Sequence, residues 1–283
     1  MIYEELNIWK NCDCKIRTDA TLRAYIPDNF SEIDLERKHR AVLICPGGAY
    51  RMVSEREGEP VALEFLSKGI AAFVLNYSVA PAKYPTALLE ASRAIWLIRE
   101  NADKWHIDTD NIAIGGFSAG GHLAASVGTM WNEEFIAKEL GMPEGMNKPN
   151  KLILCYPVLI SDEGRCHKGS FVNLLGDGLS QEEYDKFSLD KRVGAHTPPT
   201  FIWHTYNDNG VPVDSSLEFS LALRKNDIPF EMHIYPSGPH GISLGDRRVY
   251  ADKSLENADK KVLADIKYVS NWIDHCTKWM KEA

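Results

Sequence analysis

A serine flanked by two glycines is the first feature of this sequence that could do chemistry. Ser118 has Gly116 two residues before it and Gly120 two residues after it. Apolar residues at 112–114 precede this turn and small residues at 119–126 follow it, which predicts a buried strand, a tight turn and a helix. Such a nucleophile elbow needs glycines where the strand and the helix pass close together. It also places the serine at a helix N-terminus, where backbone N–H groups favour a developing negative charge.

A serine hydroxyl is a weak nucleophile near neutral pH, so Ser118 needs a histidine base within hydrogen-bonding distance. His240 is the one histidine of nine in a Gly- and Pro-rich loop directly after the last predicted strand. This loop lies at the end of the sheet where the serine turn also opens. We therefore predict that His240 is the base. His122 is the second candidate, although the role of a polar helix residue packed beneath the turn fits it better.

The acid that orients the base should lie between the serine and the histidine in the chain, in a loop at the same end of the sheet. Asp208 follows the penultimate predicted strand and fits this order. Asp162 follows the preceding strand and is the main competitor, because its loop could reach the same imidazole. Asp214 is better explained as the cap of the helix that follows it.

Acyl transfer also needs backbone donors that stabilise an oxyanion. The N–H of Ala119, directly after the serine, is one candidate. The turn at 47–49 comes directly after a buried strand and is expected to provide the other, because both turns lie at the carboxyl ends of strands. The alternative is that these glycines only turn the chain.

The remaining pattern predicts an α/β fold, with a mostly parallel central sheet and helices on both of its faces. Strands are expected at 15–27, 41–45, 70–77, 112–116, 151–157, 200–204 and 229–235. Helices are expected at 59–68, 85–101, 119–130, 214–226 and 262–280, with a polar loop up to residue 150. The first strand alternates polar and apolar residues and should pair antiparallel, whereas the run at 41–45 is uniformly apolar, which is typical of a parallel strand buried on both faces.

No break in composition divides the chain, so we expect one domain over residues 1–283. Residues 161–198 show no clear regular pattern. They are expected to form a small cap-like excursion over the sheet that lines the substrate pocket, together with Tyr50.

The formal net charge of −8 argues against nucleic acid or an anionic membrane as a partner and favours a small neutral substrate. The first 20 residues contain neither a signal peptide nor a membrane span. We therefore expect a cytoplasmic protein, unless a leader has been removed. A homo-oligomer is compatible with the sequence, which does not encode the oligomeric state.

Six cysteines do not form a metal-binding pattern. Cys45 and Cys155 lie in strand-like runs and are expected to be small buried apolar residues. Cys12 and Cys14 have no second pair at zinc spacing, so a metal site there is a minor alternative. The size of the chain argues against disulfides. We expect no metal and no organic cofactor.

Four motifs together resemble the α/β-hydrolase esterase/lipase family, and within it the bacterial acetyl-xylan-esterase-like carbohydrate esterases, or sugar hydrolases. The motifs are Pro46–Tyr50, Gly116–His122, His204–Pro212 and Tyr235–Gly241. The resemblance implies that Ser118 is the nucleophile, Asp208 the acid and His240 the base. It also implies that Gly48, Ala49 and Ala119 donate to the oxyanion. Related lipases and esterases usually have histidine at the position of Pro46, which bears on the support of this loop.

These residues predict a serine carboxylesterase that removes small acyl groups, most simply acetyl, through an acyl-enzyme. The resemblance alone adds a sugar or short oligosaccharide as the alcohol part. A serine peptidase or lipase of the same fold is an alternative. A binding module that has lost catalysis is another, but it predicts a broken triad.

Overall fold

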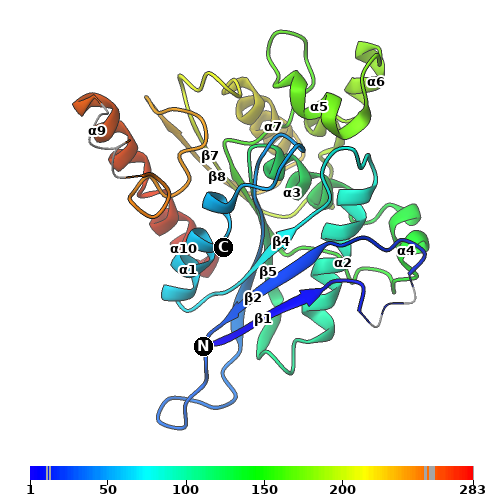
Figure 1. Ribbon diagram of the computed structural model, residues 1–283, viewed down its shortest axis with the longest axis vertical. Helices are drawn as coiled ribbons and strands as arrows, with labels where there is room; N and C mark the ends of the chain where they lie inside the picture. Colours follow the sequence, from blue (N-terminus) through cyan, green and yellow to red (C-terminus); the bar gives the residue numbers. More distant parts are fainter. Residues whose placement is uncertain (11, 13, 252–253, 255–258, 283) are drawn as a thin grey trace.

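Eight strands form one sheet in the computed structural model, which describes residues 1–10, 12, 14–251, 254 and 259–282. The order across the sheet is β1-β2-β4-β3-β5-β6-β7-β8 (Figure 1). The strands are β1 (Ile2–Asn7), β2 (Thr21–Ile26), β3 (His39–Cys45), β4 (Ala71–Asn76), β5 (Ile107–Phe117), β6 (Lys151–Cys155), β7 (Thr200–Thr205) and β8 (Phe230–Tyr235). β2 pairs antiparallel with β1 and β4, and all other pairs are parallel.

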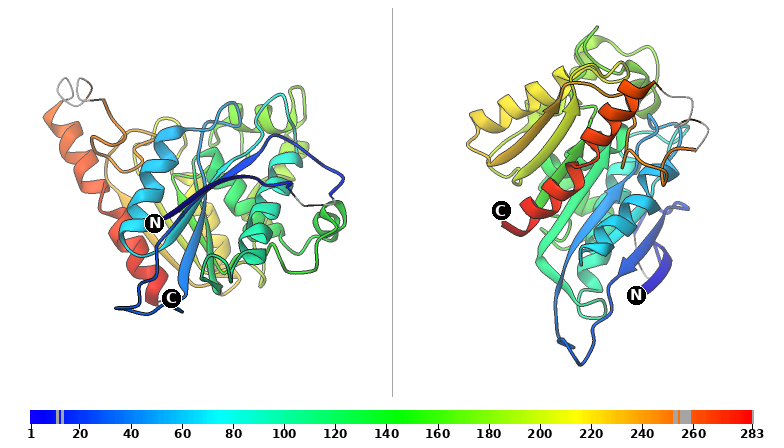
Figure 2. Two further views of the ribbon diagram at one scale, coloured as in Figure 1. Left: turned by 60° about the horizontal axis from the view of Figure 1, so that its bottom comes forward. Right: turned by 90° about the vertical axis from the view of Figure 1, so that its left-hand side faces the viewer.

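Helices cover both faces of the sheet, as the uniformly apolar strands require. α2 (Thr86–Glu100), α3 (Ala119–Met130) and α7 (Asp214–Lys225) pack on one face, and α1 (Glu59–Ser67), α9 (Lys260–Val269) and α10 (Trp272–Glu282) pack on the other (Figure 2). Successive residues of β3 alternate between the two cores: Leu43 joins the first, and Val42 and Ile44 join the second. Each central strand therefore contributes to both cores.

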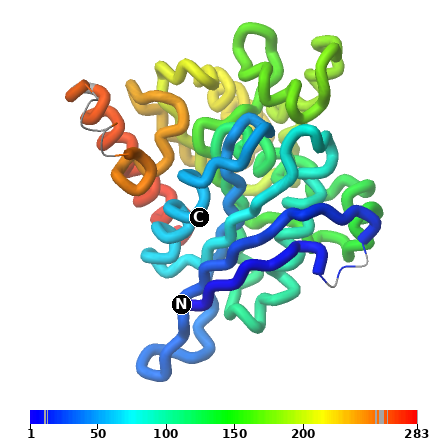
Figure 3. Tube along the Cα trace, in the orientation of Figure 1, coloured from blue at the N-terminus to red at the C-terminus, as the bar shows by residue number. Residues whose placement is uncertain are grey.

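Residues 161–198 form α5 (Lys168–Leu175), α6 (Gln181–Asp185) and the 3-10 helix η2 (Leu189–Arg192). α5 and α6 lie beyond the carboxyl ends of the parallel strands, at the top of Figure 1. The loop between β2 and β3 extends from the opposite end of the sheet (Figure 3). In the described part of the chain, no helix combines the length and the apolar character that a bilayer span requires.

The predicted strands and helices are present, with the following differences. β1 was not predicted, because an edge strand whose residues alternate between half-buried and exposed has a weak apolar pattern. The opening strand starts at Thr21 rather than at residue 15. The supposed polar loop up to residue 150 contains α4 (Glu134–Leu140).

The C-terminal helix, predicted as one element, is divided into α9 and α10 around Ser270 and Asn271. The Ser270 hydroxyl donates to the carbonyl of Lys267 at 2.7 Å. Serine and asparagine side chains compete for backbone groups and disfavour a helix interior, which explains the break.

The cysteines at residues 12 and 14 correct one expectation. The structure joins Cys12 to Cys14 as a disulfide, whereas the sequence argued against any. The size of a chain does not determine whether a local turn brings two cysteines together, and here their Cα atoms are 5.3 Å apart. Cys45 and Cys155 are buried, as expected.

The elbow depends on close contacts between backbones. Ser118 has φ 53° and ψ −120°, which is a strained conformation for a residue with a side chain. A Cβ on Gly116 would overlap the carbonyl of Gly120, and a Cβ on Gly120 would overlap the carbonyls of Cys45 and Pro46. The glycines therefore allow β5, α3 and the loop after β3 to meet at this serine.

Replacing Gly120 with alanine should lower the free energy of unfolding by about 3 kcal/mol or more, because the new methyl group meets backbone that cannot move aside. Gly128→Ala in the same helix is the matched control. Its Cβ would first meet the end of the Leu152 side chain, at 3.1 Å, which can shift. Urea denaturation should show a change of at most about 1 kcal/mol for Gly128→Ala. Equal losses in the two variants would contradict this explanation.

Candidate active site

Ser118, His240 and Asp208 form a continuous line of hydrogen bonds at the carboxyl ends of the strands. The Oγ of Ser118 lies 2.8 Å from Nε2 of His240, and Nδ1 of His240 lies 2.7 Å from Oδ2 of Asp208. Ser118 directly precedes α3, Asp208 follows β7 and His240 follows β8. The three residues are distant in the sequence, and the sheet brings them together in the geometry that a serine, its base and an orienting acid require.

The Asp208 carboxylate is buried and fully engaged. Its side chain is 1% exposed, and Oδ1 accepts the backbone N–H groups of Gly210 at 2.8 Å and Val211 at 2.9 Å. Burial by itself raises the pKa of Asp208, but the contacts from His204, His240 and Val211 outweigh it and hold this pKa well below its ordinary value. Asp208 therefore remains ionised and can orient His240.

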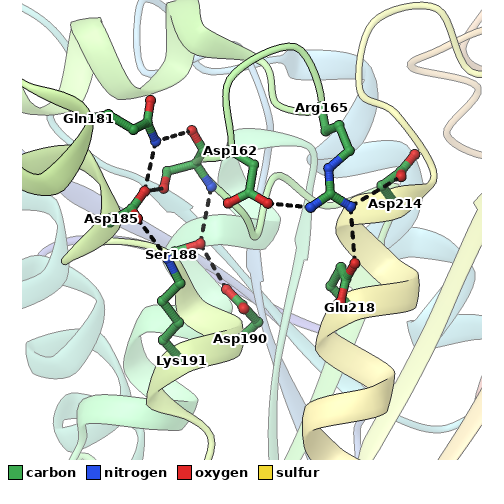
Figure 4. Close-up of polar contacts among 10 residues, drawn as sticks. Asp162, Arg165, Gln181, Asp185, Ser188, Asp190, Lys191, Asp214 and Glu218 are labelled. Carbon is green, nitrogen blue, oxygen red and sulfur yellow. Dashed lines mark hydrogen bonds and ion pairs between the residues drawn. The ribbon is translucent and has the colours of Figure 1, made fainter.

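Asp162, the alternative acid, binds elsewhere. Its carboxylate pairs with Arg165, whose other nitrogen contacts Asp214 at 3.5 Å and Glu218 at 3.0 Å (Figure 4). The structure therefore brings Asp208, and not Asp162, to the imidazole of His240. Asp214 is the first residue of α7 and its side chain makes no capping hydrogen bond, which corrects its expected role as a cap.

A second, neighbouring set of polar contacts holds the excursion together. Asp185 of α6 accepts hydrogen bonds from Ser161 at 2.7 Å and Gln181 at 2.7 Å and pairs with Lys191 at 2.8 Å. The hydroxyl oxygen of Ser188 accepts the backbone N–H of Ser161 at 3.1 Å, so the start of the excursion is tied to the residue that precedes η2 (Figure 4).

Side chains from two other segments hold the loop at 46–50. The hydroxyl of Tyr77 donates to the carbonyl of Pro46 at 2.6 Å, and Asn173 of α5 donates to the carbonyl of Ala49 at 2.8 Å. Ala49 and Tyr50 both have positive φ values, of 57° and 55°. Related lipases and esterases usually have histidine at the position of Pro46. In this chain, the contacts from Tyr77 and Asn173 hold the loop without that histidine.

Three backbone N–H groups near Ser118 lack an acceptor among the residues that the structure describes. They belong to Gly48, Ala49 and Ala119. These are the donors expected for an oxyanion, and they come from the 46–50 loop and the start of α3.

Glu57 was missed by the sequence analysis. It is buried, and its Oε2 accepts the N–H of Gly47 at 2.8 Å while its Oε1 accepts the hydroxyl of Tyr156 at 2.7 Å. The Tyr156 oxygen accepts the N–H of Ser243 at 3.0 Å, and its ring packs edge-on against His240 with 5.0 Å between centroids. One carboxylate thus joins the 46–50 loop to the loop that carries His240. Glu57 lies in an acidic stretch that reads as solvated surface, so no sequence signal identified it.

A cleft of about 230 Å³ opens over these residues. Ser118, His240 and the backbone of Gly48 and Ala49 line it, and the excursion contributes His167. Tyr50, expected in this lining, is instead buried beside His122. Within the described ranges, no group of three or more His, Cys, Asp or Glu residues could hold a metal ion.

A family model, BD-FAE, matches residues 28–223, which is more than half of the chain. The chain belongs to the BD-FAE family. The chain is 37% identical over 258 residues to endo-1,4-beta-xylanase B of Butyrivibrio fibrisolvens, covering 87% of this chain and 39% of that protein. It is 32% identical over 243 residues to an acetylxylan esterase of Xylanibacter ruminicola, covering 84% of this chain and 47% of that protein. The chain thus spans less than half the length of both relatives.

A solved structure similar to this BD-FAE chain is the acetyl ester-xyloside bifunctional hydrolase from Caldicellulosiruptor lactoaceticus. The two are 36% identical, with a TM-score of 0.79 over 99% of this chain and 96% of that one. This likeness confirms the α/β-hydrolase fold and the resemblance to carbohydrate esterases that the motifs indicated.

His122 of this BD-FAE chain lies under the site and outside the line from Ser118 to Asp208. Its Nδ1 is 2.9 Å from the hydroxyl of Tyr50, and its Nε2 is 3.2 Å from the carbonyl of Phe187. It therefore connects α3 to the 46–50 loop and to the excursion. Burial lowers the pKa of His122 to about 4.

The pKa of His122 predicts a loss of stability in acid. The unfolded chain takes up this proton as the pH falls through the ordinary value of 6.5, and the folded chain takes it up only near 4, so stability is lost between these values. The loss should reach about 3 kcal/mol below pH 4. Urea titrations between pH 7 and pH 4 should show a shallower dependence for His122→Gln than for wild type. His275→Gln, an exposed control on α10, should keep the wild-type slope; an unchanged slope in His122→Gln would exclude His122 as the source.

Proposed function

We propose that this chain is a serine carboxylesterase, with Ser118 as nucleophile, His240 as general base and Asp208 as the acid that orients His240. The observation that carries the proposal is the line of two hydrogen bonds, 2.8 Å and 2.7 Å long, from Ser118 through His240 to Asp208. A buried, ionised aspartate holds the imidazole in the tautomer that accepts the serine proton and then stabilises the imidazolium. The intact line argues against a binding module that has lost catalysis.

In the first half of the reaction, His240 takes the proton from Ser118 as Oγ attacks the carbonyl carbon of the ester. The carbonyl oxygen becomes an oxyanion, which accepts hydrogen bonds from the N–H of Ala119 and from the N–H groups of Gly48 and Ala49. The bond to the alcohol then breaks, and His240 returns its proton to the leaving alkoxide. The acyl group remains on Ser118.

In the second half, His240 takes a proton from a water molecule, which attacks the acyl-enzyme at the same carbonyl carbon. The second oxyanion uses the same donors. Its collapse breaks the bond to Ser118, and His240 gives the proton to Oγ. The carboxylic acid leaves, the free serine is restored, and neither a metal nor an organic cofactor takes part in the proposed cycle.

The proposed substrates are small acyl esters, above all acetyl esters, of sugars or short oligosaccharides. The names of an acetylxylan esterase and an acetyl ester-xyloside hydrolase among the similar proteins support this class. A cleft of about 230 Å³ with polar groups in its lining supports a small dissolved ester over a long acyl chain. The net charge of −8 supports the same choice over nucleic acid or a membrane surface.

The proposal includes a single domain over residues 1–283, with residues 161–198 as a small cap. His167 from this segment lines the cleft, which supports the assignment. Every residue of the proposed site comes from one chain, so the mechanism does not require a homo-oligomer. The cytoplasmic location stays a prediction.

The assignment of the acid can be tested with 4-nitrophenyl acetate. Asp208→Asn should lower kcat by about 10⁴-fold, because the imidazole loses its orienting partner. Ser118→Ala should lower kcat by about 10⁶-fold. Asp162→Asn is the matched control and should change kcat little. A larger loss for Asp162→Asn than for Asp208→Asn would overturn the assignment.

A fluorophosphonate probe tests the enzyme proposal independently of substrate. The wild type should be labelled under native conditions and Ser118→Ala should not. An unlabelled wild type would favour the binding module.

The acyl preference can be measured with 4-nitrophenyl esters of two to eight carbons. We expect kcat/KM to be highest for acetyl and at least about tenfold lower for octanoyl, because a small cleft cannot accept the added methylenes. Acetylated xylo-oligosaccharides, followed by acetate release, test the sugar part. Highest turnover on the octanoyl ester would contradict the small-acyl proposal and support a lipase.

A further inference from the structure

The cleft over Ser118 has a charge opposite to that of the whole chain. The exposed charged side chains in its lining are Arg51 and Arg56. The carboxylate in the lining, Glu57, is buried, and both of its oxygens already accept hydrogen bonds from Gly47 and Tyr156. A chain of net charge −8 therefore presents two guanidinium groups at the place where the substrate must enter.

Arg56 is placed against the loop that carries His240. Its backbone carbonyl accepts a hydrogen bond from the hydroxyl of Ser243 at 2.8 Å. Its Nη2 lies 2.8 Å from the point that a Cβ on Gly241 would occupy. Because Gly241 directly follows His240, the Arg56 guanidinium lies next to the histidine that would protonate the leaving alcohol. Arg56 also lines the same cleft as Ser118 and His240, so we expect the alcohol part of the ester to lie near this group.

Both guanidinium groups are without a carboxylate partner among the residues that the structure describes. Neighbouring arginines are paired: Arg23 contacts Glu55 at 3.1 Å, and Arg248 pairs with Asp246 and Glu64. An arginine presents its N–H donors in a fixed fork that matches a carboxylate. The guanidinium groups of Arg51 and Arg56 line the cleft and can therefore bind a carboxylate of the substrate.

We propose that the cleft binds esters whose alcohol part carries a carboxylate, such as O-acetylated uronic acids, and that Arg56 binds this carboxylate with support from Arg51. The inference rests on the proposed esterase function and specifies its substrate. It differs from the neutral substrate that the net charge of the chain favoured, because a substrate responds to the charges that line the cleft rather than to their sum over the chain.

The test compares two substrates that differ only in charge: methyl 2,3,4-tri-O-acetyl-glucuronoside and its 6-carboxamide. We expect wild-type kcat/KM, measured as acetate release, to be about fivefold higher for the acid than for the amide, because two partly exposed ion pairs contribute. About 0.5 M NaCl should reduce this ratio towards one, because it screens exposed charges. A wild-type ratio of one at low salt would overturn the proposal.

Variants assign the preference to residues. Arg56→Gln should reduce the acid-to-amide ratio to about two, and the double variant Arg51→Gln/Arg56→Gln should reduce it to about one. Arg224→Gln, on the exposed end of α7 and outside the cleft, removes the same charge and should leave the ratio at its wild-type value. A ratio that falls equally in Arg224→Gln, or that persists in the double variant, would refute the role of the two arginines.

A binding measurement keeps this inference separate from the proposed function. Ser118→Ala cannot form an acyl-enzyme, so calorimetry with the same acid and amide reports binding alone. Tighter binding of the acid, reduced in Ser118→Ala/Arg56→Gln, would support the carboxylate site even if the wild type hydrolysed no ester. Equal binding of acid and amide would refute it, and activity on 4-nitrophenyl acetate would then leave the esterase proposal standing.

Discussion

The site depends on a close approach of three backbone segments, where β5 turns into α3 beside the loop that follows β3. Gly116 and Gly120 have no room for a Cβ, and a Cβ on Gly47 would lie 2.8 Å from the carbonyl of Phe117. Packing this tight leaves little freedom in the relative position of Ser118 and the 46–50 loop. The strained φ of 53° at Ser118 persists because the surrounding contacts determine it.

Polar contacts then fix the loops that the sheet only brings near. Glu57 holds the 46–50 loop through Gly47 and holds the loop after β8 through Tyr156 and Ser243. Burial raises the pKa of Tyr156 well above its ordinary value, so its hydroxyl stays protonated and donates to Glu57. Because each member of this buried network is satisfied, it restricts movement of the donors and of His240 together.

Runs of apolar residues and the positions of glycine and proline were sufficient to predict the central strands, the elbow and the loops at the carboxyl ends of the strands. The order of serine, acid and histidine along the chain then admitted both Asp208 and Asp162 as the acid, and the position after the penultimate strand favoured Asp208, which the structure brings to His240. Chain order alone could not exclude Asp162, because its pairing with Arg165 is a tertiary contact that no local pattern marks. Glu57 was missed for the same reason: its partners lie 10 and 99 residues away, and no local pattern marks them. Pattern also failed for β1, which is an edge strand with little apolar character.

The groups proposed to react with the ester and the side chains proposed to select its alcohol part lie in different parts of this fold. The proposed nucleophile, the proposed base and the expected oxyanion donors are held by backbone packing and buried hydrogen bonds, which leave little room for substitution. Arg51, Arg56 and His167 line the same cleft, and the two arginines project from exposed segments of the chain. Changes at the arginines alter the charge that an incoming alcohol meets without disturbing the contacts that place Ser118. One arrangement of reacting groups could therefore serve neutral or charged esters, according to residues that the elbow does not constrain.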